Sequence, residues 1–207
     1  MLSRYIDGIM IRTFDQKEVE DLAQYGDIPI INGLTDFSHP CQVLADLMTI
    51  REYKGSFDGL KMCYIGDGNN MANSLIVGGL KVGMSVSAAT PADYRPAKEV
   101  MDFAEGFDCF KITDDPKEAA KDADILLTDV WASMGQELKP RRAAKRLPDI
   151  RLTTASWLSQ SRTLLLCTAC LRTARRKSPQ RCLRNMRTRF LKRLKTVCMH
   201  RRRLWLS

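Results

Sequence analysis

The chain has 207 residues, of which 44% are hydrophobic and 28% charged, an ordinary globular composition with room for one large domain or two small ones. No apolar run approaches the roughly 18 residues that span a membrane, and the first 30 residues lack the apolar core of a signal peptide. We therefore expect neither a membrane protein nor a secreted one. The net charge of +9 alone would suggest a nucleic-acid or membrane-surface partner.

That charge is divided unequally along the chain. Residues 139–207 hold 21 Lys and Arg residues and a single acid, Asp149, which gives +20, whereas residues 1–138 hold 12 basic and 23 acidic residues, which gives −11. All 12 glycines precede residue 139. The two parts differ in character, so the whole-chain charge does not indicate the function of the first part.

The first 128 residues alternate between strand-like and helix-like segments. Repeated βα units with short connections predict an α/β fold with a doubly wound parallel sheet, in which ligands bind at the carboxyl ends of strands. The helix expected over 43–53 is the best defined, because its apolar residues recur at helical spacing: Val43, Leu44, Leu47, Met48 and Ile50. The expected strands are 7–12, 28–32, 61–65, 85–89, 109–112 and 125–128, and the other expected helices are 18–25, 69–82, 99–105 and 117–121.

The first candidate site is the segment HPCQ at 39–42, where a helix begins. Pro40 suits a first helical position, and the free N–H groups of a helix start favour an anion. His39 and Gln42 can each donate a hydrogen bond to a carbonyl or phosphate oxygen. The alternative is an ordinary helix start with a half-buried histidine.

The second candidate site is GDGNNMANS at 66–74, between a strand and a helix. Its glycine spacing matches neither a dinucleotide fingerprint nor a phosphate P-loop. The amides of Asn69 and Asn70 could hold an amino acid through hydrogen bonds. The alternative is a Gly- and Asn-rich turn with a capping asparagine.

The third candidate site is TDVWASMGQ at 128–136, which follows a buried strand. Asp129 could pair with a cationic amine, and Ser133 could add an orienting hydrogen bond. The alternative is an aspartate that caps the following helix.

Together these segments resemble the ornithine carbamoyltransferases. The resemblance covers residues 4–137, and its motifs follow one another in the family's order and spacing. The spacing of the aspartate and the Ser-Met-Gly in the third segment favours the ornithine branch over the aspartate and putrescine branches. The motifs are GLTD at 33–36, HPCQ, LADL at 44–47, GDGNN at 66–70 and TDVWASMGQ.

The resemblance implies that carbamoyl phosphate is one ligand. Arg12 matches a family arginine that holds it, and His39 and Gln42 match residues that contact its carbamoyl group. The implied reaction is attack of the neutral δ-amine of L-ornithine on the carbamoyl carbon, giving citrulline and phosphate. This chemistry requires positioning and oxyanion stabilisation, but no metal or organic cofactor.

The resemblance also implies an ornithine site and a homotrimer with shared active sites. Asn70 and Asp129 match residues that bind ornithine. Ser133 and Met134 match the segment that closes over it.

Two features depart from the family pattern. Family members begin with a domain that binds carbamoyl phosphate through a Ser-x-Arg-Thr-Arg segment, and this segment does not occur in the sequence. We therefore expect residues 1–38 to be a remnant of that domain, 39–56 an interdomain helix, and 57–137 an incomplete ornithine-binding domain. Two strands and a helix bury little core by themselves.

The second departure is the loss of family motifs after Glu137. One synonymous coding of residues 162–175, read from the last base of its first codon, gives Asp-Ala-Ile-Val-Met-His-Cys-Leu-Pro-Ala-His-Arg, the family segment that the protein lacks. Residues 192–201 and 147–153 can yield further family segments in the same frame. We interpret residues 138–207 as an out-of-frame basic tail, irregular or unstructured. No catalytic set is then complete, because the family's reactive cysteine is encoded out of frame.

Cysteine usage adds two expectations. The tail contains Cys167 and Cys170 at CxxC spacing, but no second pair or suitably spaced histidine follows, so a zinc site is not indicated. Cys41, Cys63 and Cys109 are too scattered for a disulfide framework, which favours a reducing cytoplasm.

Two functions remain open. The first is a carbamoyltransferase-family enzyme present as an inactive fragment. The second is a non-catalytic binding protein whose Arg-rich tail contacts nucleic acid or other polyanions through charge alone. The genomic reading frame around codon 137 would distinguish them.

Overall fold

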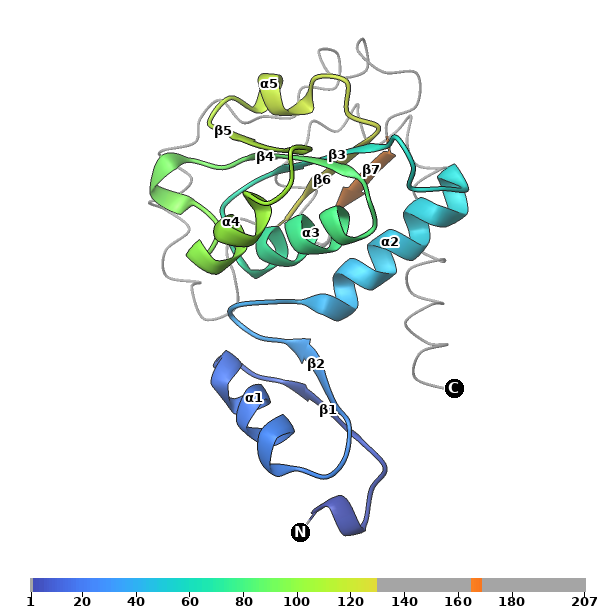
Figure 1. Ribbon diagram of the computed structural model, residues 1–207, viewed down its shortest axis with the longest axis vertical. Helices are drawn as coiled ribbons and strands as arrows, with labels where there is room; N and C mark the ends of the chain where they lie inside the picture. The colour runs from blue at the N-terminus through green and yellow to red at the C-terminus, as the bar shows by residue number, and fades with distance from the viewer. Residues whose placement is uncertain (1, 130–164, 169–207) are drawn as a thin grey trace, which may run out of the picture.

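The computed structural model describes residues 2–129 and 165–168 (Figure 1). Its strands and helices alternate along the chain and fall into a small N-terminal unit and a larger five-stranded unit. In chain order they are η1 (Leu2–Arg4), β1 (Ile9–Arg12), α1 (Gln16–Tyr25), β2 (Ile30–Leu34), α2 (Pro40–Lys54), β3 (Lys61–Ile65), α3 (Asn70–Lys81), β4 (Ser85–Ala89), η2 (Ala92–Tyr94), α4 (Lys98–Ala104), β5 (Phe110–Thr113), α5 (Pro116–Ala120), β6 (Ile125–Thr128) and β7 (Leu165–Thr168).

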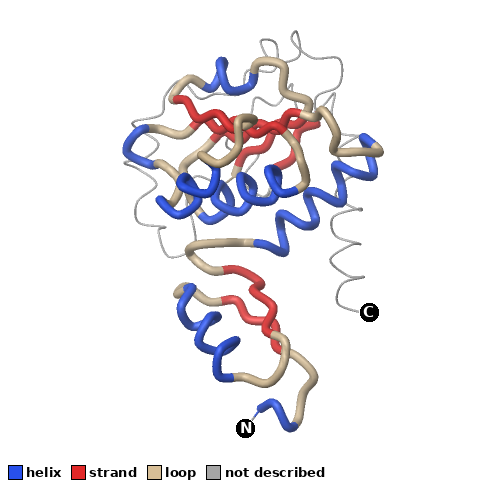
Figure 2. The backbone as a smooth tube through the Cα atoms, viewed as in Figure 1, coloured by secondary structure: helices blue, strands red, loops and turns tan. Residues whose placement is uncertain are grey.

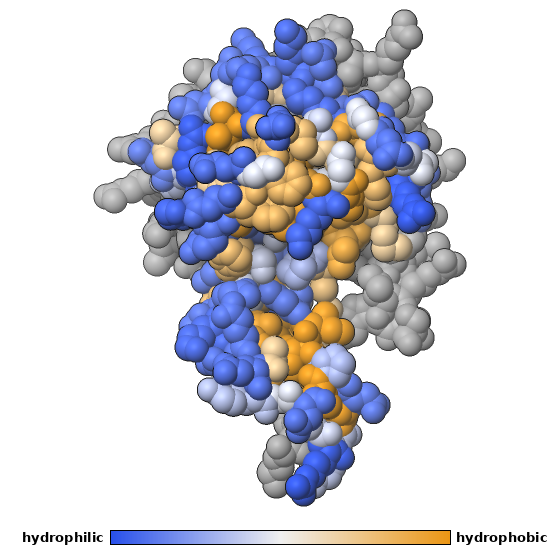
Figure 3. All heavy atoms as spheres, in the orientation of Figure 1, coloured by the Kyte–Doolittle hydropathy of each residue, from blue (hydrophilic) through white to orange (hydrophobic). Residues whose placement is uncertain are grey.

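The N-terminal unit consists of β1, α1 and β2. The two strands pair in parallel with Met10 opposite Ile31. Of the hydrophobic residues described before α2, only Val19 and Leu34 are buried, whereas Met10 and Ile31 are 45% and 50% exposed. Figure 3 shows the apolar area that this unit leaves at the surface. Such limited burial agrees with the marginal stability expected of two strands and one helix.

Helix α2 joins the two units. Pro40 occupies its first turn, where the missing N–H costs no hydrogen bond. The helix ends at Lys54, and Gly55 follows with a φ of 81°, a left-handed conformation that glycine adopts without strain.

The buried side of α2 differs from the expected apolar face. Leu44 is 58% exposed and Met48 40% exposed, although the helical spacing of the apolar residues places both on one apolar face with Val43, Leu47 and Ile50. Polar Asp46 and Thr49 are buried, because they lie on the same side of the helix as the buried apolar residues Val43, Leu47 and Ile50. The expected apolar face is therefore wrong at Leu44 and Met48. The side of α2 that is buried carries both apolar and polar residues.

The larger unit is built on a parallel sheet with strand order β5-β4-β3-β6-β7. Helices α2, α3 and α4 lie against one face of the sheet and α5 against the other (Figures 1 and 2). The predicted doubly wound α/β fold is confirmed.

Alternating strand residues supply two separate cores. Met62 and Tyr64 point into the larger core beneath α2, α3 and α4, and Cys63 and Ile65 point into the smaller core beneath α5. All four side chains are at most 1% exposed. β3 is thus covered on both faces, as its uninterrupted apolar run predicts.

Two glycines let α3 approach its neighbours closely. A Cβ at Gly78 would stand 2.6 Å from Val43 Cγ1, and a Cβ at Gly79 would stand 2.5 Å from Met62 Cε. Glycine inside a helix costs about 1 kcal/mol relative to alanine, so here close packing on α2 and on the sheet offsets a local penalty.

The strands 61–65, 85–89 and 125–128 have the bounds expected from the sequence, and the other expected elements lie within three residues of theirs. α1 begins at Gln16 because the Asp15 carboxylate accepts a hydrogen bond from the Lys17 N–H (2.9 Å) and caps the helix.

None of the helices in the described ranges is both long and apolar enough to cross a membrane.

One strand was not expected. β7 pairs in parallel with β6 over Leu165–Thr168, within the segment interpreted as an irregular tail. For these four residues that expectation is wrong, since a short apolar run can extend an existing parallel edge whatever the charge of its surroundings. The expectations for the other residues of 138–207 lie outside the described residues.

Candidate functional site

The chain reverses its direction of strand addition at β3. From β3 it adds β4 and β5 on one side, and then crosses through α5 to place β6 on the other side. In parallel sheets of this kind, ligands bind in the crevice at the carboxyl ends of the strands where the order reverses. In this chain the segment 66–69 follows β3 and Asp129 follows β6, and we call the edge between them the crevice.

A hydrogen bond joins the two sides of this crevice. Asn69 Nδ2 donates to Asp129 Oδ2 at 3.1 Å. The Asn69 Oδ1 accepts from the N–H groups of Met71 (3.0 Å) and Ala72 (3.1 Å), so the same side chain caps α3. The predicted capping asparagine and the predicted acid at the strand end are therefore in direct contact.

Tyr64 supports the crevice from beneath. Its side chain is fully buried, and its hydroxyl donates to the Asp67 carbonyl oxygen at 3.0 Å. Burial, followed by the negative charges of Asp129 and Asp67, raises the pKa of Tyr64 well above its usual value. The phenol therefore stays protonated at neutral pH and remains a hydrogen-bond donor beneath the loop.

Asn70 faces the connection between β2 and α2. Its Nδ2 donates to the Thr35 carbonyl oxygen at 2.6 Å. Two further residues of α3 reach the same connection: Asn73 Nδ2 donates to the Phe37 carbonyl oxygen (2.9 Å), and Ser74 Oγ accepts from the His39 N–H (2.8 Å). The N-terminal half of α3 thus fastens the segment between the two units.

The residues predicted to hold carbamoyl phosphate lie at or near the carboxyl ends of β1 and β2. Arg12 ends β1 opposite Leu34, and His39 precedes the first turn of α2 with 9% of its surface exposed. Gln42 is buried in that turn, where its Nε2 donates to Asp46 Oδ1 at 3.0 Å. Their roles toward carbamoyl phosphate stay predictions.

The expected grouping of Asn70, Asp129 and Ser133 is described only in part. The side chain that contacts Asp129 is Asn69, the neighbour of Asn70. Ser133 and Met134 lie outside the described residues. The ornithine-binding roles assigned to these residues stay predictions.

Sequence reasoning missed the polar side of α3. Asn70, Asn73 and Ser74 share one helix face, because they are spaced three and four residues apart. This polar stripe on an otherwise apolar helix is visible in the sequence and is a signal for a buried polar contact. Asn73 is only 5% exposed, so its two hydrogen bonds replace those that water would supply.

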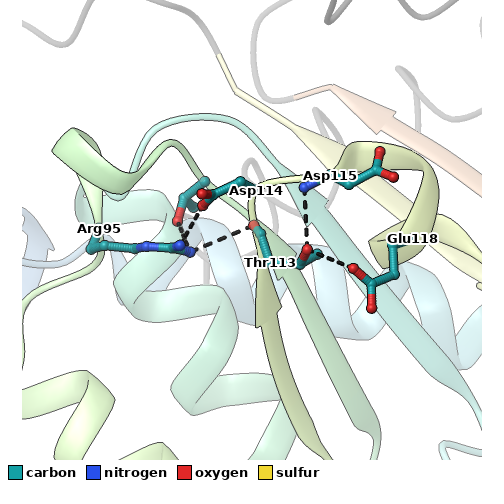
Figure 4. Close-up of polar contacts among 6 residues, drawn as sticks. Arg95, Thr113, Asp114, Asp115 and Glu118 are labelled. Atoms are coloured by element: carbon teal, nitrogen blue, oxygen red, sulfur yellow. Dashed lines mark hydrogen bonds and ion pairs between the residues drawn. The ribbon is translucent and has the colours of Figure 1, made fainter.

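Arg95 connects the ends of β4 and β5 (Figure 4). Its guanidinium donates to Thr90 Oγ1 (3.3 Å) and to the Thr113 carbonyl oxygen (3.5 Å), and it pairs with Asp114. The backbone beside Arg95 in turn contacts the loop after β3, since the Gly68 N–H donates to the Tyr94 carbonyl oxygen at 2.7 Å.

Within the described ranges, no three His, Cys, Asp or Glu side chains gather as metal ligands would. Cys167 and Cys170, the CxxC pair of the tail, have no described side chains.

Comparison with known proteins identifies the family. A family model described as the carbamoyl-P binding domain of aspartate/ornithine carbamoyltransferase matches residues 1–52, and the model of the Asp/Orn binding domain of the same family matches residues 58–166, more than half of the chain. This chain belongs to the aspartate/ornithine carbamoyltransferase family. The second match runs past Glu137, so family likeness extends further than the sequence motifs indicate, and the displaced reading frame stays a prediction.

Individual relatives agree with this family. The ornithine carbamoyltransferase of Thermococcus kodakarensis is 54% identical over 150 residues, which is 70% of this chain and 48% of the relative. The solved ornithine carbamoyltransferase from Pyrococcus furiosus has a TM-score of 0.75 at 45% identity, covering 82% of this chain and 56% of that one. For the anabolic ornithine carbamoyltransferase from Campylobacter jejuni the TM-score is 0.83 at 27% identity, covering 95% and 67%. The chain therefore spans about half the length of the curated relatives it matches.

Proposed function

We propose that this carbamoyltransferase-family chain carries the ornithine-binding part of an ornithine carbamoyltransferase and binds L-ornithine beside Asp129. The observation that carries the proposal is the place of Asp129, at the end of β6 and in contact with Asn69 across the crevice. A carboxylate at this edge is suited to pair with an ammonium group. The relatives named above, all ornithine carbamoyltransferases, support ornithine as the ligand.

The reaction proposed for the complete enzyme uses both units. The lone pair of the ornithine δ-amine attacks the carbamoyl carbon of carbamoyl phosphate, and the bond from that carbon to the phosphate oxygen breaks. The amine gives up a proton, which ends on the released phosphate. Citrulline and phosphate result. Arg12, His39 and Gln42 would hold carbamoyl phosphate, and Asn70, Asp129, Ser133 and Met134 would hold ornithine.

Hydrogen bonds from α3 hold the connection at 35–39 in place. These contacts support the proposal that each unit binds one of the two reactants. The reactants must meet in near-attack geometry, and a fixed connection between the two binding units supplies it. Asn70 lies at the boundary, since it borders the proposed ornithine site and donates to Thr35 of the connection.

We further propose that these 207 residues alone do not transfer the carbamoyl group. The Ser-x-Arg-Thr-Arg segment does not occur in them, and neither does the family's His-Cys-Leu-Pro segment, which carries its reactive cysteine. Loss of one such stabilising group typically costs on the order of 10²–10³ in rate. Several losses together should leave no turnover above background.

Two measurements test the proposal. Isothermal titration calorimetry should show weak L-ornithine binding by the full chain, and Asp129→Asn should weaken it by roughly tenfold or more, because an ammonium ion loses its charged partner. Asp102→Asn, an exposed acid on α4, is the matched control and should leave binding unchanged. Equal binding by Asp129→Asn and the original chain would contradict the ornithine site.

The second measurement is citrulline formation from ornithine and carbamoyl phosphate, with chain purified free of host enzyme. We expect none. Turnover within about a hundredfold of a complete family member would contradict the inactive-fragment proposal, because losses at several groups should exceed that factor. Restoring the frame at codon 137 together with the rest of the carbamoyl-phosphate domain should restore activity.

Assembly and location belong to the same proposal. The homotrimer implied by the family can be tested by sedimentation of the purified chain. A reducing cytoplasm remains the location proposed from the scattered cysteines.

A second candidate function rests on the charge of +20 carried by residues 139–207. A segment of that charge would bind polyanions without sequence preference, and the affinity would fall steeply with salt. Filter binding of random-sequence DNA at two salt concentrations tests this candidate, with the chain ended after residue 138 as control.

A further inference from the structure

The side chain amide of Asn69 forms hydrogen bonds with four groups, one of which is the Tyr64 hydroxyl, which donates to Asn69 Oδ1 at 3.5 Å. Its Oδ1 accepts from the N–H groups of Met71 and Ala72, and its Nδ2 donates to Asp129 Oδ2. The two N–H groups belong to the first turn of α3, whereas Asp129 follows β6. One residue thus connects the start of a helix to the end of a strand 60 residues away.

The orientation of this amide follows from its partners. Backbone N–H groups can only donate, so the atom facing Met71 and Ala72 must be the oxygen, and the NH₂ group must point toward Asp129. A carboxylate of Asp129 accepts there. Because capping requires Oδ1 to face the N–H groups of α3, Nδ2 must face Asp129. A flip of the amide would break both sets of hydrogen bonds.

The loop that carries Asn69 is itself held on two sides. The Tyr64 hydroxyl donates to the Asp67 carbonyl oxygen, and the Gly68 N–H donates to the Tyr94 carbonyl oxygen. Gly68 also lies against the backbone of Arg95 and Pro96, where a Cβ would collide. The position of Asn69 therefore depends on contacts of its loop with β3 and with the backbone at 94–96, as well as on its own hydrogen bonds at the crevice.

We infer that Asn69 is a positioning residue, which orients the Asp129 carboxylate for an amine ligand and ties that orientation to the first turn of α3. The inference rests on the proposed function, because it assigns the amine of ornithine to Asp129.

The chemistry of an amide suits this role. A neutral donor fixes a carboxylate through one hydrogen bond without cancelling its negative charge. A lysine or arginine at the same place would form an ion pair and compete with the ligand's ammonium group.

Substitutions at Asn69 can separate capping from positioning. Asn69→Ser keeps a capping oxygen for the N–H groups of α3 but has no second group to reach Asp129, whereas Asn69→Ala loses both functions. We expect Asn69→Ser to lower the melting temperature little and to weaken L-ornithine binding about tenfold, as expected for a hydrogen bond to a charged group. Asn69→Ala should do both. Asp115→Ser, which changes the cap of α5, is the matched control and should leave ornithine binding unchanged.

A readout without ligand tests the contact itself. In a double-mutant cycle of Asn69→Ser and Asp129→Ala, denaturation should show non-additive effects on stability if the two side chains interact. Additive effects would overturn the inference. Unchanged ornithine binding by Asn69→Ser, with binding lost in Asp129→Asn, would overturn it as well.

The analogue L-norvaline, which lacks the δ-amine, and 5-aminopentanoate, which lacks the α-amine, identify the amine concerned. If Asp129 binds the α-amine, Asn69→Ser should weaken binding of L-norvaline and leave binding of 5-aminopentanoate unchanged. If Asp129 binds the δ-amine, the reverse should hold. An equal loss for both would indicate a general disturbance of the crevice and contradict a positioning role. If the original chain binds no ornithine, the proposed function fails, while the cycle still decides whether Asn69 holds Asp129.

Discussion

Asn73 in α3 donates a hydrogen bond from Nδ2 to the carbonyl oxygen of Phe37 at 2.9 Å, and thereby joins the larger unit to the connection that leads out of β2. The Oδ1 of the same side chain accepts from the Ala97 N–H at 3.0 Å. One buried amide therefore spans three segments that are distant in sequence.

We expect Asn73→Ala to lower the free energy of unfolding by about 2–4 kcal/mol, because it leaves a backbone carbonyl and a backbone N–H without their partner in a buried place. Urea denaturation measures the change. Gln24→Ala, at an exposed position of α1, is the control and should change stability by less than about 0.5 kcal/mol. Equal effects of the two substitutions would show that the Asn73 contacts contribute little.

Gly68→Ala should disturb the loop that carries Asn69. The new Cβ would collide with the backbone of Arg95 and Pro96, and backbone cannot rotate away as a flexible side chain can. We expect a loss of about 1–3 kcal/mol in stability, the usual range for overpacking, together with weaker ornithine binding. Gly106→Ala is the control, since its Cβ would meet the Phe103 carbonyl oxygen only at 3.4 Å. A Gly68→Ala chain with unchanged stability and affinity would mean that the loop tolerates displacement.

Arg95→Met should remove the polar connection between the ends of β4 and β5 but keep most of the aliphatic stem. Arg95 is 34% exposed and Asp114 61% exposed, so solvent screens their ion pair and the loss should be about 1 kcal/mol or less. The difference between the two chains should shrink in high salt. Arg51→Met, at an exposed position of α2, serves as control. A larger loss that does not respond to salt would assign the effect to the hydrogen bonds with Thr90 and Thr113.

The sequence predicts the strands and helices well where one local signal dominates. The buried run at 61–65 and the cap at Asp15 are examples, since each depends on residues near in the chain. The exposed Leu44 and Met48 are not predictable in this way, because which side of α2 faces the protein depends on how α3 packs against it. β7 depends on an open sheet edge that only the assembled fold provides.

The candidate site is also predictable in part, where the order of elements decides it, and unpredictable where local packing decides it. Placing Asp129 and the segment 66–74 at one edge needs only the order of βα units, and the sequence predicts it. That Asn69 rather than Asn70 contacts Asp129 depends on the first turn of α3, where consecutive side chains point about 100° apart. A capping asparagine and a neighbouring asparagine cannot be told apart before that turn is built.

Cys63 makes a prediction about pH. It is fully buried in the core beneath α5, and burial raises the pKa of its thiol from 9.0 to about 12. Between these values the unfolded chain has lost the thiol proton and the folded chain has kept it. The folded state then binds more protons, so its stability must fall as the pH rises from about 9 toward 12. The slope approaches about 1.4 kcal/mol per pH unit for one proton.

Cys63→Ala isolates this contribution. We expect the variant to be less stable at pH 8, because a buried side chain is shortened, but to lose stability less steeply above pH 9. Urea denaturation at pH 8, 9 and 10 measures both effects. Burial also raises the pKa of Tyr64, so Tyr64 makes stability fall with rising pH as well. Its contribution is the same in the original chain and in Cys63→Ala, and it cancels when the two slopes are compared. Cys109→Ala, at an exposed position, should keep the original slope. If Cys63→Ala and the original chain lost stability in parallel above pH 9, the thiol at position 63 would not be held in its neutral form by the fold.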